Sequence, residues 1–217
     1  MRWISVLVLV ISLIATGLIV PGLTSTTQAQ EGVNAADLPV TPDPALCVVE
    51  PRPLAFFEQY VGTPDATPSD EGSAEFEGSL DSFVPPEGQP ADPETVDAVV
   101  ATAVEVVACF NAGDLPRAFA LYSDDLIESF AAADPLPQEE FDAMAATPTA
   151  APADQRSSVL AVRDVILLDD GRVGGFIDFE FEDGYHETQY AVLTLEGDRW
   201  LVDEILLFAP SAATPTP

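Results

Sequence analysis

The spacing of apolar and polar residues changes along this chain of 217 residues. Residues 4–20 form an almost unbroken apolar run. In residues 91–145 apolar residues recur at helical spacing, and in residues 159–208 apolar and polar residues alternate. A period near 3.6 is typical of a helix with one buried face, and a period of two is typical of a half-buried strand. The pattern therefore predicts helices followed by strands within residues 91–210.

The first predicted helix begins after Asp92 and ends at Gly113. Asp is a favoured N-cap, Pro93 suits the first helical position, and glycine readily takes the left-handed conformation that ends a helix. The apolar stripe of this helix is Val96, Val99, Val100, Ala103, Val107 and Phe110.

Further helical segments are predicted before residue 147. Asp114 caps the next helix, which carries Leu115, Phe119, Leu121 and Tyr122 as its apolar positions. The pair Asp124-Asp125 precedes another short turn through Phe130, and a third helix is predicted from Gln138 to Ala145.

Four strands are predicted after a Pro/Ala-rich loop at residues 147–158. Their turns lie at Asp169-Asp170-Gly171, Asp183-Gly184 and Glu196-Gly197-Asp198, and Asp-Gly is a strong signal for a two-residue hairpin. The first strand covers residues 159–168, the third covers residues 185–195 and the last covers residues 200–208. The second strand starts at residue 173, and in it Ile177, Phe179 and Phe181 alternate with acids. Helices followed by a meander indicate an α+β fold, with three helices packed on one face of an antiparallel sheet of about four strands.

The N-terminus is typical of an export signal. Met1-Arg2 supplies a positive start, the apolar run follows, and Thr27-Gln28-Ala29 is a small-residue cleavage site. We therefore predict a signal peptide at residues 1–29. The apolar run is also long enough, at the lower limit, to span a bilayer, so an uncleaved anchor at residues 4–20 is the alternative. In both cases the chain beyond residue 30 is expected to be extracytoplasmic, either secreted or at the cell surface.

The composition of residues 30–90 predicts an arm and linker before the domain. The composition of residues 211–217 predicts a disordered tail. The arm is rich in Pro and Gly and contains twelve acids and one Arg. Within it, only Cys47 to Tyr60 carries enough apolar surface to pack, as an extended piece and a helical turn. Residues 63–90 have the composition of a solvated linker.

The two cysteines, Cys47 and Cys109, are an even pair in a chain expected to be exported. An oxidising compartment favours a disulfide between them, which would tie the arm to the domain. Two separately buried thiols are the alternative, because free Cys is among the most buried residue types.

Charge excludes several classes of partner. The chain has seven cations, all Arg, against 37 acids, and its formal net charge is −30. Nucleic-acid phosphates and anionic membrane surfaces both require a cationic face, so neither is an expected partner. A single His and two Cys are too few for the ligand sets of common zinc sites, and we expect neither a metal nor a cofactor.

Two groups of motifs resemble the nuclear transport factor 2-like superfamily, which includes ketosteroid isomerases and SnoaL-like polyketide cyclases. The run CFNAGDL at residues 109–115, followed by ALYSDD at 120–125, is similar to the junction of its first two helices, and GDRWLV at 197–202 is similar to its C-terminal hairpin. The resemblance covers residues 91–210. It implies a cone-like, curved sheet wrapped over helices, with a pocket that some members use for catalysis and others for binding.

The ketosteroid isomerases carry a Tyr that donates to the developing oxyanion, an Asp base and a protonated Asp. Matching the motifs places these roles at Val106, Phe130 and about Ala191. All three positions are apolar, whereas an enolising enzyme needs a base and oxyanion donors within reach of its substrate. The match therefore argues against isomerase chemistry.

Three polar residues remain candidates for acid/base chemistry: Tyr122, His186 and Asp203. His186 shares a strand face with Tyr190, either as a pair of donors in a pocket or as part of an exposed polar face. Asp203 and Glu204 are adjacent, and the sequence does not decide which carboxylate points inward. No nucleophile motif accompanies the single His.

Four aromatic residues are candidates for a ligand pocket: Tyr122, Phe130, Tyr190 and Trp200. Pockets are mostly apolar and aromatic, although the same residues also suit an ordinary core. The acids in the run from Asp178 to Gly184 lack the spacing of a calcium-binding loop and fit a solvated strand face.

Two functions remain open at this point. The first is a non-catalytic module that binds a small hydrophobic ligand or a protein, with a homodimer as one possibility. The alternative is a SnoaL-like isomerase, cyclase or hydrolase acting on a small hydrophobic molecule.

Overall fold

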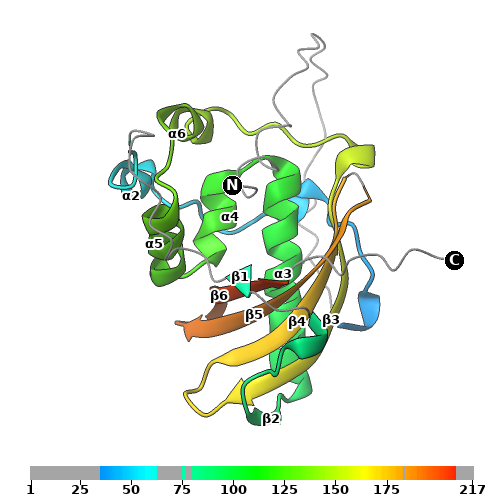
Figure 1. The fold of residues 1–217 in the computed structure, drawn as a ribbon. Coiled ribbons are helices and arrows are strands. Elements are labelled where there is room, and N and C mark those ends of the chain that lie inside the picture. Colours follow the sequence, from blue (N-terminus) through cyan, green and yellow to red (C-terminus); the bar gives the residue numbers. More distant parts are fainter. Residues whose placement is uncertain (1–34, 63–74, 77–79, 183, 209–217) are drawn as a thin grey trace, which may run out of the picture. The chain divides into compact units, whose positions relative to one another are not determined.

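The computed structural model describes residues 35–62, 75–76, 80–182 and 184–208, which belong to one unit of the chain. The predicted signal peptide or anchor at residues 1–29 and the tail at 211–217 lie outside these residues. Figure 1 shows the order of the elements along the chain.

Helix α3 (Pro93–Ala112) has the limits that its caps predict. The Asp92 carboxylate accepts a hydrogen bond from the Thr95 N–H at 3.0 Å, and Gly113 ends the helix in the left-handed region with φ +68°. The helix is long and apolar enough to cross a membrane, but more than half of that apolar window is buried against the rest of the unit. Its apolar side chains therefore build the core.

The later helices differ in detail from the prediction. Asp114 caps α4 (Leu115–Ala118), which continues into a 3₁₀ turn, η5 (Phe119–Leu121). Helix α5 (Asp124–Ala133) is longer than the predicted short turn, and its N-cap is Ser123, whose hydroxyl accepts from the Leu126 N–H at 3.1 Å. The two aspartates therefore lie inside the first turn, where a helix favours negative charge. Helix α6 (Gln138–Met144) occupies the third predicted position.

The predicted meander is present as four antiparallel strands. They are β3 (Ser158–Leu168), β4 (Val173–Glu180), β5 (His186–Glu196) and β6 (Arg199–Phe208). The β5–β6 turn has two residues, with Gly197 at φ +67°. The β4–β5 turn is longer than predicted, because the Phe181 N–H bonds the Tyr185 carbonyl outside both strands. Asp183, in the predicted hairpin, lies outside the described residues.

Two short strands extend the sheet at its edges. Strand β2 (Gly88–Pro90) pairs antiparallel with β3, and β1 (Glu75–Phe76) pairs parallel with β6, so the order is β1-β6-β5-β4-β3-β2. These residues lie in the predicted solvated linker; they pair with the edges of the sheet, and all three residues of β2 are exposed. Edge pairing uses backbone groups, so a polar composition did not prevent it.

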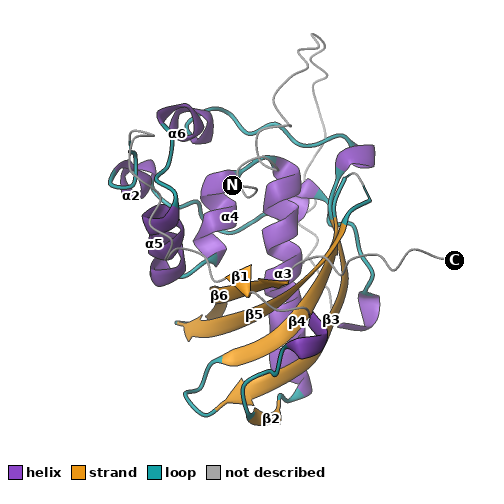
Figure 2. Cartoon of the chain, viewed as in Figure 1, coloured by secondary structure: helices purple, strands orange, loops and turns teal. Residues whose placement is uncertain are grey.

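The sheet has apolar residues on both faces, and helix α3 lies along one of them (Figures 1 and 2). The cluster on that face, the helix-side core, includes Val99, Val106, Ile177 and Ala191. Neighbouring strand positions point the other way. They form the outer-face cluster of Leu168, Phe176, Tyr190, Val192 and Phe208.

The arm packs against the helix-side core. Its helical pieces are η2 (Ala35–Asp37), η3 (Pro44–Leu46) and α2 (Leu54–Glu58). Val49 and Phe57 are buried, and Val40 exchanges two backbone hydrogen bonds of 2.9 Å with Val159 of β3. The prediction that the segment from Cys47 to Tyr60 packs on the domain is confirmed.

A second stretch of the arm, residues 80–90, covers the outer-face cluster, and we call it the strap. It contains the 3₁₀ turn η4 (Leu80–Ser82), then Phe83, and ends in β2. Strands β1 and β2 pair at opposite edges of the sheet, and the strap runs over the outer face to β2. Phe83 packs against the cluster on the way. A final 3₁₀ turn, η6 (Ala153–Gln155), precedes β3.

Candidate functional site

The three positions matched to ketosteroid isomerase roles lie together on the helix side. Val106 of α3 and Ala191 of β5 are buried members of the helix-side core, and Phe130 of α5 packs against it. Apolar side chains at these positions can neither take up a proton nor donate a hydrogen bond to an oxyanion. These three side chains therefore supply neither the base nor the oxyanion donors that enolisation needs.

Tyr122 follows η5 and lies in the helix-side core. Its ring centroid is 5.6 Å from that of Phe119 and 6.4 Å from that of Phe130, and the next residue donates its N–H to the Val202 carbonyl at 2.8 Å. Burial raises the pKa of the Tyr122 phenol, so it stays neutral at physiological pH. It can donate a hydrogen bond, but it is no base.

Trp200 of β6 also packs against the helix-side core. Its backbone carbonyl accepts a hydrogen bond from the Thr102 hydroxyl at 3.1 Å, which ties β6 to α3. Tyr122, Phe130 and Trp200 therefore lie on one side of the sheet. Tyr190, the fourth pocket candidate, belongs to the opposite face.

His186 lies at the start of β5 and is 65% exposed at its side chain. Its Nε2 is 3.5 Å from a carboxylate oxygen of Glu180, the residue paired with it across β4 and β5. Thr188, on the same face, donates to the Asp178 carboxylate at 2.7 Å. The strand face is polar where it begins and becomes apolar at Tyr190.

Asp203 and Glu204 occupy an irregularity between β5 and β6, where Val192 pairs with Glu204 and Leu193 pairs with Val202. This extra residue allows both carboxylates to reach one cation. Arg172 binds Asp203 at 3.0 Å, and it also binds Glu204.

Arg172 also binds Asp170, at 2.8 Å, so it is surrounded by three carboxylates. The hydrogen bonds that Arg172 donates to Glu204, and then to Asp170, raise the pKa of its guanidinium. The predicted inward carboxylate is therefore engaged in an ion network. Tyr122, His186 and Asp203 are not brought together into one site.

Tyr190 is the most unusual polar residue of the described part of the chain. It is 1% exposed, yet its hydroxyl is buried with no hydrogen-bond partner among those residues. Burial, with a smaller contribution from the Glu204 carboxylate, raises its pKa. A buried hydroxyl without a partner loses its hydration and gains nothing in exchange.

Aromatic rings surround Tyr190 on the outer face. Its ring centroid is 5.1 Å from that of Phe176 on β4 and 5.0 Å from that of Phe83 on the strap. Phe83 also lies 5.1 Å from Phe208 of β6 and 6.0 Å from Phe176. The strap thus places one ring above rings from three neighbouring strands.

Gly174 provides the space for the Tyr190 hydroxyl. A Cβ atom at this position would lie 2.1 Å from the hydroxyl oxygen, so no residue with a side chain fits beside this Tyr conformation. Gly174 lies near the start of β4, and Arg172 directly precedes that strand. The hydroxyl therefore points toward the end of the sheet that carries the Arg172 network.

Arg163 of β3 closes another side of the outer-face cluster. Its guanidinium lies 4.5 Å from the centroid of the Phe176 ring, a cation–π arrangement, and binds Asp178 at 3.0 Å. The hydrogen bond with Asp178 is the main cause that raises the pKa of Arg163. The cluster is thus apolar at its centre and lies between two ion networks.

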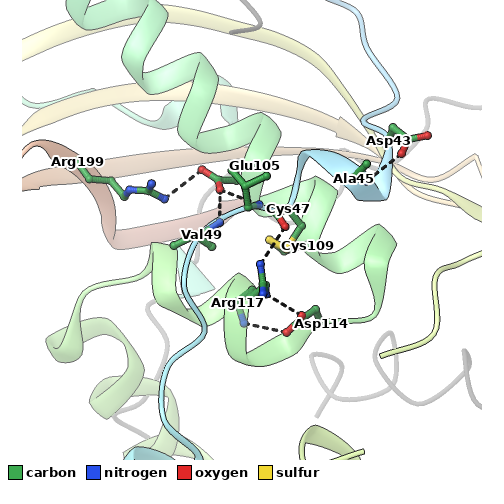
Figure 3. Close-up of a disulfide and its surroundings, with 10 residues drawn as sticks. Asp43, Ala45, Cys47, Val49, Glu105, Cys109, Asp114, Arg117 and Arg199 are labelled. Atoms are coloured by element: carbon green, nitrogen blue, oxygen red, sulfur yellow. Dashed lines mark hydrogen bonds and ion pairs between the residues drawn. A yellow bond between two sulfur atoms is a disulfide. The ribbon is translucent and has the colours of Figure 1, made fainter. Parts of the chain in front are cut away.

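The arm is fastened beside α3 by a disulfide between Cys47 and Cys109, as Figure 3 shows. The predicted pairing is confirmed, and the alternative of two separate thiols is wrong. Glu105, one turn earlier, accepts hydrogen bonds from the Val49 N–H at 2.8 Å and from Arg199 of β6 at 3.1 Å. Arg117 donates to the Cys47 carbonyl at 3.3 Å.

A second clamp holds the arm at Arg52. Its Nε donates to the Phe119 carbonyl at 2.8 Å, and its other nitrogens bind the Tyr122 carbonyl and the Asp124 carboxylate. The guanidinium also lies 4.5 Å from the centroid of the Phe56 ring. These contacts engage the backbone of Tyr122 in holding the arm, which suits a structural role for that residue.

No group of three or more His, Cys, Asp and Glu among the described residues is arranged to hold a metal ion. No protein-family model, curated protein or solved structure matches the chain. The resemblance to the nuclear transport factor 2-like superfamily therefore rests on the sequence motifs and stays a prediction.

Sequence reasoning missed the outer-face site. Phe83 lies in a stretch whose acids and prolines suggested a linker. The one local signal is the pair Gly174-Gly175 inside a strand, because glycine in a strand interior often marks a close approach of another group. Tyr190 was identified as a pocket candidate, but its partners were placed on the other face.

Proposed function

We propose that the chain is an extracytoplasmic, non-catalytic binding module with a nuclear transport factor 2-like fold, and that it takes a small hydrophobic ligand. One observation carries this proposal: the positions that the motifs match to the catalytic polar groups of ketosteroid isomerases are Val106, Phe130 and Ala191, and these pack in one apolar core. Of the polar candidates, Tyr122 lies in the same core, whereas the side chain of His186 is exposed and Asp203 binds Arg172.

Two further features support the proposal. The Cys47–Cys109 disulfide suits an oxidising, extracytoplasmic compartment, as does the predicted signal peptide. All six Arg residues of the described chain form ion pairs with carboxylates. Because these cations are already neutralised by the protein, the surface favours neutral ligands over anionic ones.

The experiment is a thermal-shift screen of the full chain with neutral hydrophobic compounds at millimolar concentration. A ligand that binds only the folded state raises the melting temperature as its concentration exceeds its Kd. We expect a concentration-dependent rise with compounds that carry an aromatic ring. If no compound raises the melting temperature, the ligand-binding proposal is wrong.

A parallel assay tests the absence of catalysis. The chain is incubated with a β,γ-unsaturated ketone, and the conjugated product is followed by its ultraviolet absorbance. We expect no rate above that of buffer. An isomerisation rate that disappears in Tyr122→Phe or Asp203→Asn would instead favour the enzyme alternative.

A further inference from the structure

The outer face of the sheet holds a small aromatic site that the strap already fills. Rings of Phe176, Tyr190 and Phe208 come from three adjacent strands, and the Phe83 ring lies against all of them. Such a group of rings is typical of a pocket for a planar apolar ligand. Here the occupant is a side chain of the protein itself.

The Tyr190 hydroxyl distinguishes this site from an ordinary core. It is fully buried, it has no partner among the described residues, and it lies over Gly174, where any side chain would collide with it. A phenol is a better hydrogen-bond donor than acceptor, because its oxygen lone pair is shared with the ring. The group that is missing from the site is therefore a hydrogen-bond acceptor.

The strap continues after Phe83 with an exposed residue and two prolines. Val84 is 84% exposed, and it is followed by Pro85 and Pro86, which have no N–H to bond with the sheet. Phe83 itself is only partly buried. Leu80 and Phe83 are the residues of the strap that pack against the outer-face cluster.

Charge around the site limits what it can bind. Three carboxylates surround Arg172 at one end of the cluster, and Arg163 is paired with Asp178 at the other. An anionic ligand would meet excess negative charge, and any charged ligand would lose hydration among the rings. A neutral molecule fits these surroundings best.

We propose that Phe83 is a displaceable plug over a site for a neutral aromatic ligand that carries one hydrogen-bond acceptor. The ligand ring takes the place of the Phe83 ring, and its acceptor receives the Tyr190 hydroxyl proton in a hydrogen bond. This inference rests on the proposed binding function, of which it names the site and the ligand class.

The test compares two probes of similar shape, acetophenone and ethylbenzene, by calorimetric titration of the full chain. Only acetophenone has an acceptor, and a hydrogen bond is worth about tenfold in affinity. We expect acetophenone to bind the wild type about tenfold more tightly than ethylbenzene does. In Tyr190→Phe, which keeps the ring and lacks the donor, the two probes should bind equally.

Two more variants complete the test. Tyr122→Phe makes the same change on the helix side, so it should leave the ratio of the two affinities unchanged. Phe83→Ala removes the plug and should tighten the binding of both probes by about tenfold or more, because the site no longer has to be vacated.

The inference is overturned if the two probes bind the wild type equally, or if Tyr190→Phe leaves their ratio unchanged. If other hydrophobic compounds still raise the melting temperature, the binding function stands and only this site is wrong. If neither the wild type nor Phe83→Ala binds either probe, the site is wrong as well. Tyr190→Phe is nearly isosteric with the wild type, so the test does not depend on whether Phe83→Ala folds.

Discussion

Tyr190 and Gly174 depend on each other, because the phenol of one lies where a side chain of the other would be. The ring gains from burial among Phe83, Phe176 and Phe208, whereas the hydroxyl loses its hydration without a partner. The two effects oppose each other within one side chain. Without a ligand, the folded chain with Tyr at position 190 is therefore expected to be less stable than the same chain with Phe there.

The stability of Tyr190→Phe tests this account directly. Without ligand, we expect the variant to have a free energy of unfolding higher than that of the wild type by about 1 kcal/mol, since the unpaired hydroxyl is removed. Urea denaturation followed by circular dichroism measures the difference. A loss of about 1 kcal/mol would instead mean that the hydroxyl has a partner in solution.

Gly174→Ala should lower the free energy of unfolding by about 1–3 kcal/mol, because the new methyl group overlaps the Tyr190 hydroxyl. Gly175→Ala is the matched control. Its Cβ would meet the Val165 side chain at 3.3 Å on the other face, and a smaller loss is expected. Combining Gly174→Ala with Tyr190→Phe should cost less than the sum of the two single changes, as neighbouring residues couple. Strict additivity in urea denaturation would contradict the contact.

Among the elements, those whose limits are set by neighbours in sequence were predicted well. Asp92 caps α3 through Thr95, three residues away, and Gly113 ends it with its own backbone. The strap was missed because its partners lie far along the chain: Gly88 pairs with Leu168, and Phe83 meets Phe176. No local pattern contains that information.

The arm and α3 are joined by the disulfide and by several hydrogen bonds. Replacing Cys47 and Cys109 together by Ser frees a loop of about 60 residues in the unfolded chain, and about 4 kcal/mol of stability should be lost. Because Glu105 still holds the Val49 N–H and Arg52 still binds the Phe119 carbonyl, we expect the arm to stay docked. Hydrogen exchange at the Val49 amide measures this. Full exchange at the unfolded rate would show that the disulfide alone holds the arm.

Helix α6 carries a carboxyl that opposes folding at neutral pH. Burial, with smaller contributions from Asp134 and Glu139, raises the pKa of Glu140. A carboxyl with a higher pKa in the folded chain favours folding at low pH, and that contribution is lost as the pH rises through the folded pKa.

Glu140→Gln should therefore raise the free energy of unfolding at pH 7 by less than about 1 kcal/mol, since the group is partly exposed. At pH 3 the gain in free energy of unfolding should disappear, because the protonated Glu140 side chain and the Gln side chain are then both neutral. Urea denaturation at the two pH values provides the comparison. An equal gain at pH 3 would show that the effect is not electrostatic.

For the whole molecule, the excess of acids is the dominant electrostatic property. The formal charge is −30, and the acids are spread over the arm and the domain. This was predicted from composition alone, but composition did not show that all six described Arg residues are engaged in ion pairs. Carboxylates without such partners therefore dominate the surface.

Salt should stabilise this protein. Raising NaCl from 10 to 500 mM shortens the screening length from about 30 Å to about 4 Å, which weakens repulsion among the acids. We expect the melting temperature to rise by several degrees. A fall in melting temperature would mean that the Arg ion pairs contribute more to stability than the repulsion removes.

The central claim is that a ligand binds on the outer face of the sheet and that the helix-side core takes no part in chemistry. Nuclear magnetic resonance spectra of the labelled full chain, recorded while acetophenone is added, test it most directly. The account predicts shifts at the rings of Phe83, Phe176 and Tyr190, with the methyl signals of Val106 and Ala191 unchanged. Shifts at Val106 and Ala191 would place the ligand in the helix-side core and contradict the claim.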